Sequence, residues 1–126
     1  MLHAGPDPQA LSRDVEVVRR YLEDPLVHGR VSAALAAGMM DAQLRTAAGA
    51  GRIPVPMLLL HGEDDRLCPV AGSRTFHDGL PHDRVAGSAI RTYAALRHEI
   101  FNEPEREAVY GDLLAWLEAT PGAWPG

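Results

Sequence analysis

Two clusters of polar side chains in the sequence could carry chemistry. The first, LHGEDDRLCP at residues 60–69, contains Asp64 and Asp65 directly after an apolar run. The second, LRHEIFNEP at residues 96–104, contains His98. An aspartate beside a histidine fixes the imidazole tautomer and stabilises the imidazolium that forms when a nucleophile loses its proton. The clusters therefore predict the supporting pair of a nucleophilic triad, if the fold brings them together.

The elements around these clusters predict that both lie on one edge of a parallel sheet. VPMLLL, residues 55–60, is a short unbroken apolar run, typical of a strand buried on both faces. SAIRTY, residues 88–93, is a second strand candidate. One polar cluster follows each run, and loops at the carboxyl ends of neighbouring parallel strands lie side by side. We therefore predict an α/β fold class, with parallel strands alternating with helices.

Apolar spacing predicts helices on either side of these strands. They are expected from Ser12 to Asp24, over 31–48, over 70–79 and from Pro104 to Ala119. Asn102 and Glu103 are expected to cap the last of these helices, and its periodicity predicts that Val109 is buried. The helix over 31–48 has a broad apolar face, which we expect to pack on more than one neighbour. Its two methionines suggest either an acyl-chain pocket or ordinary core packing. The apolar side chains of this face are Leu35, Met39, Met40 and Leu44.

Composition narrows the class of protein. The chain has 126 residues, a net charge of -5 and a single cysteine, Cys68, which fits one domain without an internal disulfide. The acidic balance leaves no basic patch, so no nucleic-acid partner is expected. The start, MLHAGPDPQA, lacks the features of a secretory signal, and no apolar run is long enough for a transmembrane segment. We expect a cytoplasmic location.

The two motifs VPMLLLHGEDDRLCP and HEIFNEPERE together resemble the C-terminal portion of the α/β-hydrolase family, in its monoacylglycerol lipase and lysophospholipase branch. In that family an apolar strand leads to Gly-x-x-Asp, matched here by Gly62 and Asp65. The resemblance implies that Asp65 is the catalytic acid and His98 the catalytic base. It also implies one partial domain over 1–126, with the return from the lid at about 1–52. The strand-helix units carrying acid and base would occupy 53–120.

A nucleophile is the missing member of this triad. The α/β-hydrolase order is Ser, then Asp or Glu, then His, with the serine in G-x-S-x-G. Only Ser12 and Ser32 precede Asp65, and neither has flanking glycines. We therefore expect the chain to contain no nucleophile, to be inactive alone, and to lack the family's N-terminal half. In the complete enzyme the resemblance implies a small-molecule lipid ester as substrate.

Other interpretations remain open at this point. The chain could be a truncated, non-catalytic α/β interaction module that self-associates or binds the missing half, or it could belong to another esterase or peptidase of the same fold. Asp65 could merely cap the following helix or pair with a nearby arginine. Cys68 is expected as a small buried hydrophobe, with a role near the pocket as the alternative. His98-Glu99 begins the zinc pattern H-E-x-x-H, but Asn102 replaces its second histidine. No metal and no cofactor are expected.

Overall fold

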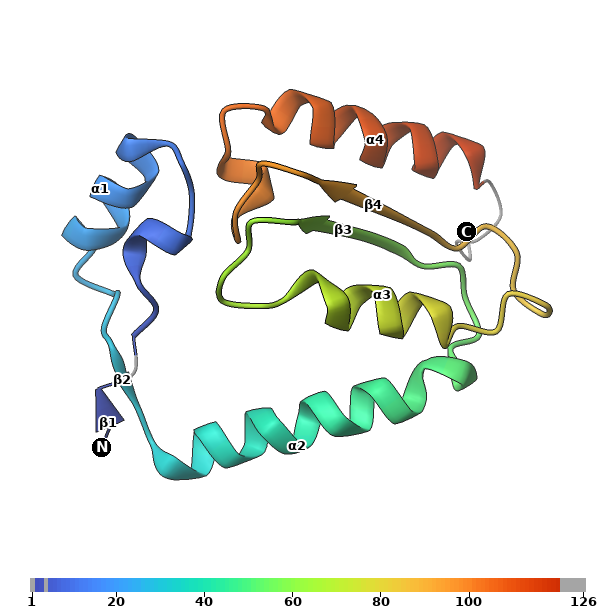
Figure 1. Ribbon diagram of the computed structural model, residues 1–126, viewed down its shortest axis with the longest axis horizontal. Coiled ribbons are helices and arrows are strands. Elements are labelled where there is room, and N and C mark those ends of the chain that lie inside the picture. Colours follow the sequence, from blue (N-terminus) through green and yellow to red (C-terminus); the bar gives the residue numbers. More distant parts are fainter. Residues whose placement is uncertain (1, 4, 121–126) are drawn as a thin grey trace.

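The computed structural model describes residues 2–3 and 5–120, in which short strands alternate with helices (Figure 1). The helices and strands are β1 (Leu2–His3), α1 (Val15–Glu23), β2 (Arg30–Val31), α2 (Ala33–Gly49), β3 (Leu58–Gly62), α3 (Val70–Asp78), β4 (Ala89–Tyr93) and α4 (Arg106–Ala119). Single 3-10 turns lie at η1 (Pro8–Ala10), η2 (Ala50–Arg52) and η3 (Ile100–Asn102).

The parallel pair β3 and β4 is the framework of the molecule. Leu58 lies opposite Ala89, and the register continues without a break to Gly62 opposite Tyr93. Helix α3 connects the two strands, and α3 and α4 flank the pair on opposite sides (Figure 1). The predicted fold class, α/β with parallel strands alternating with helices, is confirmed. Both polar clusters follow the carboxyl ends of these strands.

A small apolar core lies between the strands and α4. Leu96, Ile100 and Val109 are buried together, and Leu60 and Tyr93 pack against them. The expected burial of both faces of the first strand is wrong, because most of β3 is only half-buried. Within the residues that the structure describes, this sheet has two strands, so each strand keeps one open edge. The strand also begins at Leu58, later than the predicted start.

Helix α2 differs most from its prediction. None of its described residues is buried, although its apolar face was expected to pack on several neighbours. In Figure 1 it runs alongside α3 at the margin of the molecule. An apolar helix face without a covering layer marks a surface suited to association. The exposed fractions are 53% for Leu35, 55% for Met39, 68% for Met40 and 73% for Leu44.

Two helix starts also differ from the predictions. Helix α1 begins at Val15, where the Asp14 carboxylate accepts a hydrogen bond from the Glu16 amide, so Ser12 precedes the helix. Helix α4 begins at Arg106, and Pro104 is not its first residue. The antiparallel pairing of β1 with β2 was not predicted, because each strand is only two residues long.

Candidate active site

The loops that follow β3 and β4 are joined through their backbones. The Glu63 amide donates to the Tyr93 carbonyl at 2.9 Å, and the Asp64 amide donates to the Leu96 carbonyl at 3.0 Å. Gly62 permits this approach, because a Cβ atom there would lie 2.3 Å from the Leu96 carbonyl oxygen. The expectation that the two polar clusters are neighbours is confirmed.

Asp65 is held by the turn in which it lies. Its Oδ1 accepts hydrogen bonds from the backbone amides of Leu67, at 2.8 Å, and Cys68, at 2.9 Å. Its Oδ2 lies 2.9 Å from Nδ1 of His98, and the Asp65 side chain is only 4% exposed. It does not cap α3, whose N-cap is Pro69. The capping interpretation of Asp65 is therefore wrong for that helix.

The charge state of Asp65 follows from opposing effects. Burial raises the pKa of Asp65, whereas the Cys68 amide, His98 and the Leu67 amide lower it through hydrogen bonds. The hydrogen bonds prevail, and the pKa of Asp65 lies below its usual value. Asp65 is therefore a carboxylate at neutral pH. An anion in this position favours a proton on the His98 nitrogen that faces it.

His98 lies between β4 and η3, and the N-terminal segment holds its backbone. The His98 amide donates to the Ala10 carbonyl at 3.4 Å, and the Glu99 amide donates to the Leu11 carbonyl at 2.8 Å. The His98 side chain is 38% exposed. When Nδ1 donates to Asp65, Nε2 is left as an acceptor, which is the form required of a general base.

A second imidazole, His61 at the end of β3, supports the same loop. Its Nδ1 lies 2.7 Å from Oγ of Ser73, and its Nε2 lies 2.7 Å from the Cys68 carbonyl oxygen. The carbonyl can only accept, so Nε2 carries the proton and Ser73 donates to Nδ1. His61 Nε2 also lies 3.4 Å from Oδ2 of Asp65. Sequence reasoning gave His61 no role, although its position beside Gly62 at the strand end was the available signal.

Glu103 is the buried residue that sequence reasoning placed wrongly. It was expected to cap the last helix, but its side chain is fully buried. One carboxylate oxygen accepts from the Arg97 amide at 2.8 Å, and the other accepts from the Arg13 amide at 3.2 Å and from Nε of Arg13 at 3.1 Å. Glu103 therefore joins the residue that precedes His98 to the N-terminal segment.

The serines that precede Asp65 have structural contacts. Ser12 is buried, and its hydroxyl donates to the Asn102 carbonyl at 3.0 Å while accepting from the Asp14 amide at 2.9 Å. Ser32 is the N-cap of α2 and accepts from the Leu35 amide at 3.0 Å.

A cavity of about 210 Å³ opens beside the Asp65 and His98 side chains. Cys68 lines it and is exposed, so the expectation that Cys68 is a buried hydrophobe is wrong. Asp65, Cys68 and His98 each offer one metal-ligand atom, and these atoms all lie within 4.8 Å of one another. The full lining is Leu60, His61, Gly62, Asp65, Cys68, His98 and Ile100.

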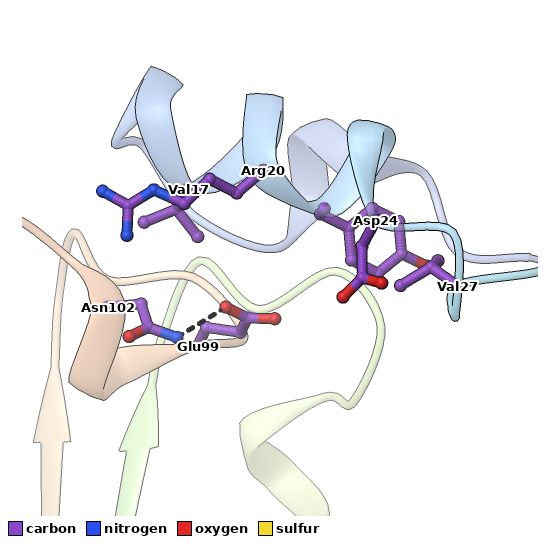
Figure 2. Close-up of a pocket in the computed structure, with 7 residues that line it drawn as sticks. Val17, Arg20, Asp24, Val27, Glu99 and Asn102 are labelled. Carbon is purple, nitrogen blue, oxygen red and sulfur yellow. Dashed lines mark hydrogen bonds between the residues drawn. The ribbon is translucent and has the colours of Figure 1, made fainter.

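A second cavity, of about 260 Å³, lies between α1 and the segment that follows His98 (Figure 2). On the side of η3, Nδ2 of Asn102 donates to the Glu99 carboxylate at 2.8 Å. Arg20 and Asp24 of the α1 region lie opposite (Figure 2). The lining therefore carries charges of both signs and favours no one class of ion. The remaining lining residues are Val17, Tyr21 and Val27.

Comparison with known proteins places this geometry in a family context. Residues 2–105 match the family model described as serine aminopeptidase, S33. A curated monoacylglycerol lipase from Mycolicibacterium smegmatis is 41% identical over 114 residues, a match that covers 88% of this chain and 39% of that protein. The chain therefore spans well under half the length of this relative.

Solved structures show the same fold. The crystal structure of Paleococcus ferrophilus monoacylglycerol lipase superposes with a TM-score of 0.85 at 38% identity, over 94% of this chain and 46% of that one. The structure of a soluble variant of Saccharomyces cerevisiae monoglyceride lipase with a substrate analog gives 0.79 at 22% identity, over 94% of this chain and 43% of that one. Among the described residues, no helix combines the length and apolar character needed to cross a membrane.

Proposed function

Because the chain belongs to the serine aminopeptidase S33 family of α/β-hydrolases, we propose that it supplies the catalytic acid and base of a serine ester hydrolase. The observation that carries the proposal is the 2.9 Å contact between Oδ2 of Asp65 and Nδ1 of His98. These side chains come from loops at the carboxyl ends of adjacent parallel strands, where open α/β sheets hold their ligands. Asp65 is the proposed acid, and His98 the proposed base.

The proposed reaction is acyl transfer through a serine. The serine hydroxyl attacks the ester carbonyl while Nε2 of His98 takes its proton, and the protonated imidazole then gives that proton to the departing alcohol. The Asp65 carboxylate stabilises the imidazolium between these steps. Water, deprotonated by His98, next attacks the acyl-serine, and the imidazolium returns that proton to the serine oxygen as the acid is released. Each cycle returns His98 to its neutral form.

The nucleophile of this proposal is not among the serines of the chain. Each of the four serines holds a hydrogen bond that does not involve His98. None of them lies in a G-x-S-x-G motif. We therefore assign the serine and the oxyanion donors to a part of the α/β-hydrolase fold that this chain does not match. The four serines are Ser12, Ser32, Ser73 and Ser88.

A monoacylglycerol or a related lysolipid ester is the proposed substrate. The support comes from the relatives named monoacylglycerol lipase at 41% and 38% identity. The cavity beside His98 adds to it, because Leu60 and Ile100 give that cavity apolar walls suited to part of a lipid ester.

A chimera tests the catalytic proposal. It joins this chain to the part of the Mycolicibacterium smegmatis relative that the chain does not match, and monoacylglycerol hydrolysis is measured. We expect activity that His98→Ala abolishes and that Asp65→Asn lowers strongly. His82→Ala, at a histidine outside the site, is the matched control and shows that the chimera folds. Hydrolysis that survives His98→Ala would refute the assignment of the base.

A non-catalytic interaction module is the second candidate, and the exposed apolar face of α2 favours it. The open edges of β3 and β4 supply unpaired backbone groups that a further strand could join. Sedimentation of the chain tests this second candidate, since a module of this kind should self-associate. A chain that stays monomeric at all concentrations would count against the interaction module.

A further inference from the structure

We propose that Asp65, Cys68 and His98 form a binding site for a thiophilic divalent cation of the zinc type. Their ligand atoms, all within 4.8 Å of one another, are a carboxylate oxygen, a thiol sulfur and an imidazole nitrogen. Thiolate, imidazole and carboxylate are the donors that Zn²⁺ takes from proteins, and three protein ligands with one water make a common open site. The inference concerns binding, which needs no serine nucleophile.

The cavity gives the cation and its water a place to lie. All three residues line the same space of about 210 Å³. With Zn–S bonds of about 2.3 Å and Zn–N bonds of about 2.0 Å, tetrahedral ligands lie about 3 to 4 Å apart. The Asp65 oxygen and the His98 nitrogen, 2.9 Å apart, must therefore separate slightly, whereas a pair near the 4.8 Å limit must approach by about 1 to 2 Å. Cys68 is exposed at the end of its loop, so rotation of its side chain can supply this movement.

Hydrogen bonds around the carboxylate orient it as a ligand. The backbone amides of Leu67 and Cys68 occupy Oδ1 of Asp65, which leaves Oδ2 directed at His98. Metal-bound carboxylates are ordinarily fixed in this way by an outer layer of donors. No metal was expected from the sequence because the known ligand patterns lie close together along a chain, whereas 30 positions separate Cys68 from His98.

Binding would change the contact between Asp65 and His98. The thiol of Cys68 loses its proton to solvent, and the cation enters where Oδ2 of Asp65 now meets Nδ1 of His98. If the proposed function holds, the imidazole then loses the partner that orients it, and such cations inhibit hydrolysis. This consequence rests on the proposed function, whereas the binding itself does not.

A titration of the chain with Zn²⁺ and Co²⁺ tests the site. We expect one Zn²⁺ per chain by calorimetry, and a thiolate-to-cobalt charge-transfer absorption that Zn²⁺ removes. Cys68→Ser should abolish the absorption and weaken Zn²⁺ binding by roughly tenfold or more. His98→Gln and Asp65→Asn should each weaken Zn²⁺ binding to a similar extent. Asn keeps the shape of the Asp65 side chain and Gln keeps a polar side chain at position 98, so the loops keep their backbone contacts.

A histidine pair elsewhere in the chain provides the control. His77 and His82 lie with ring centroids 4.7 Å apart, and neither belongs to the proposed ligand set. His82→Gln should therefore leave Zn²⁺ affinity unchanged. Absence of Zn²⁺ binding by the unmodified chain overturns the proposal, as does binding that His98→Gln leaves intact or that His82→Gln removes. Because no hydrolysis is measured, these results do not depend on the catalytic assignment.

Discussion

Oδ2 of Asp65 lies 2.9 Å from Nδ1 of His98 and 3.4 Å from Nε2 of His61, so one carboxylate oxygen faces two imidazoles. The two histidines have different partners on their other ring nitrogens. Both histidines line the open cavity, but both ring nitrogens of His61 are occupied, by Ser73 and by the Cys68 carbonyl. Of the two, only His98 is arranged to exchange a proton with a bound molecule.

The lowered pKa of Asp65 predicts a pH-dependent contribution to stability. A carboxyl whose pKa is lower in the folded chain stabilises the fold above its unfolded value of about 3.9, and this contribution is lost as the pH falls through the folded pKa. Asp65→Asn should therefore lower the free energy of unfolding at pH 7 and cost less in acid. Urea unfolding at pH 7 and in acid measures the free energy of unfolding of Asp65→Asn under each condition. The exposed Asp83→Asn is the control. An equal loss at both pH values would contradict the prediction.

Replacing the buried Glu103 should lower the free energy of unfolding by an amount that depends on the replacement. Removing one partner of a buried, hydrogen-bonded charge pair costs about 3 to 5 kcal/mol, because the other groups lose their partner. Glu103→Ala should approach this cost, and Glu103→Gln should cost less because its amide oxygen still accepts one bond. Urea unfolding gives both free energies. Glu99→Ala, at a partly exposed residue of the same segment, is the control, and a smaller loss for Glu103→Ala than for this control would refute the idea.

Gly62 is predicted to tolerate no side chain. A Cβ atom there would lie 2.3 Å from the Leu96 carbonyl oxygen and 2.4 Å from that of Arg97, and backbone cannot move away cheaply. Gly62→Ala should therefore destabilise the chain and disturb the loop that carries His98. Gly72→Ala is the matched control, because that helical position has nothing within 4 Å of the added atom. Gly72→Ala should raise the free energy of unfolding by up to about 1 kcal/mol. Thermal unfolding of both variants measures the two changes in stability, and an unchanged melting temperature for Gly62→Ala would contradict the prediction.

Tyr93 should resist ionisation. Burial raises the pKa of Tyr93 to about 12, together with the hydrogen bond from its hydroxyl to Asp112. Since the folded pKa exceeds the unfolded one, this contribution to stability is present below about pH 10 and is lost as the pH rises through the folded value. Absorbance titration of the phenols should show one late group that is missing in Tyr93→Phe. Tyr110→Phe, the control, should leave that late group in place.

A fluorophosphonate probe should label none of the serines. Such a probe reports an activated hydroxyl, and Ser73 is the sharpest test because His61 contacts it at 2.7 Å. Ser73 lies within α3 and is not among the residues that line the cavity beside His98. Mass spectrometry of the treated chain, with Ser73→Ala beside it, would reveal any adduct. A labelled Ser73 would place the nucleophile in this chain and overturn the present assignment.

The local sequence was sufficient to predict the parts that depend on neighbours along the chain. Apolar runs before Gly62 and before the His98 segment predicted both strands, and their shared direction predicted that Asp65 and His98 would lie close. The burial of Val109 also followed from its periodicity.

Features set by distant partners were not predictable in this way. Glu103 has the composition of a helix cap, and only its contacts with Arg13 and Arg97 show that it is buried instead. The apolar pattern of α2 correctly predicted a helix, but a pattern does not reveal whether a covering layer is present. Cys68 is exposed and lines the cavity, and residue type alone does not predict where a loop places its side chains.

The hydrogen bond between the Arg13 amide and Glu103 spans 90 residues, and so does that between Ser12 and Asn102. Closing so long a loop is entropically unfavourable, and contacts of such high sequence separation slow folding. The segment that holds the His98 backbone is synthesised well before its partners, and it can dock only after the segment around Glu103 has been made. Until then, the imidazole lacks its fixed position.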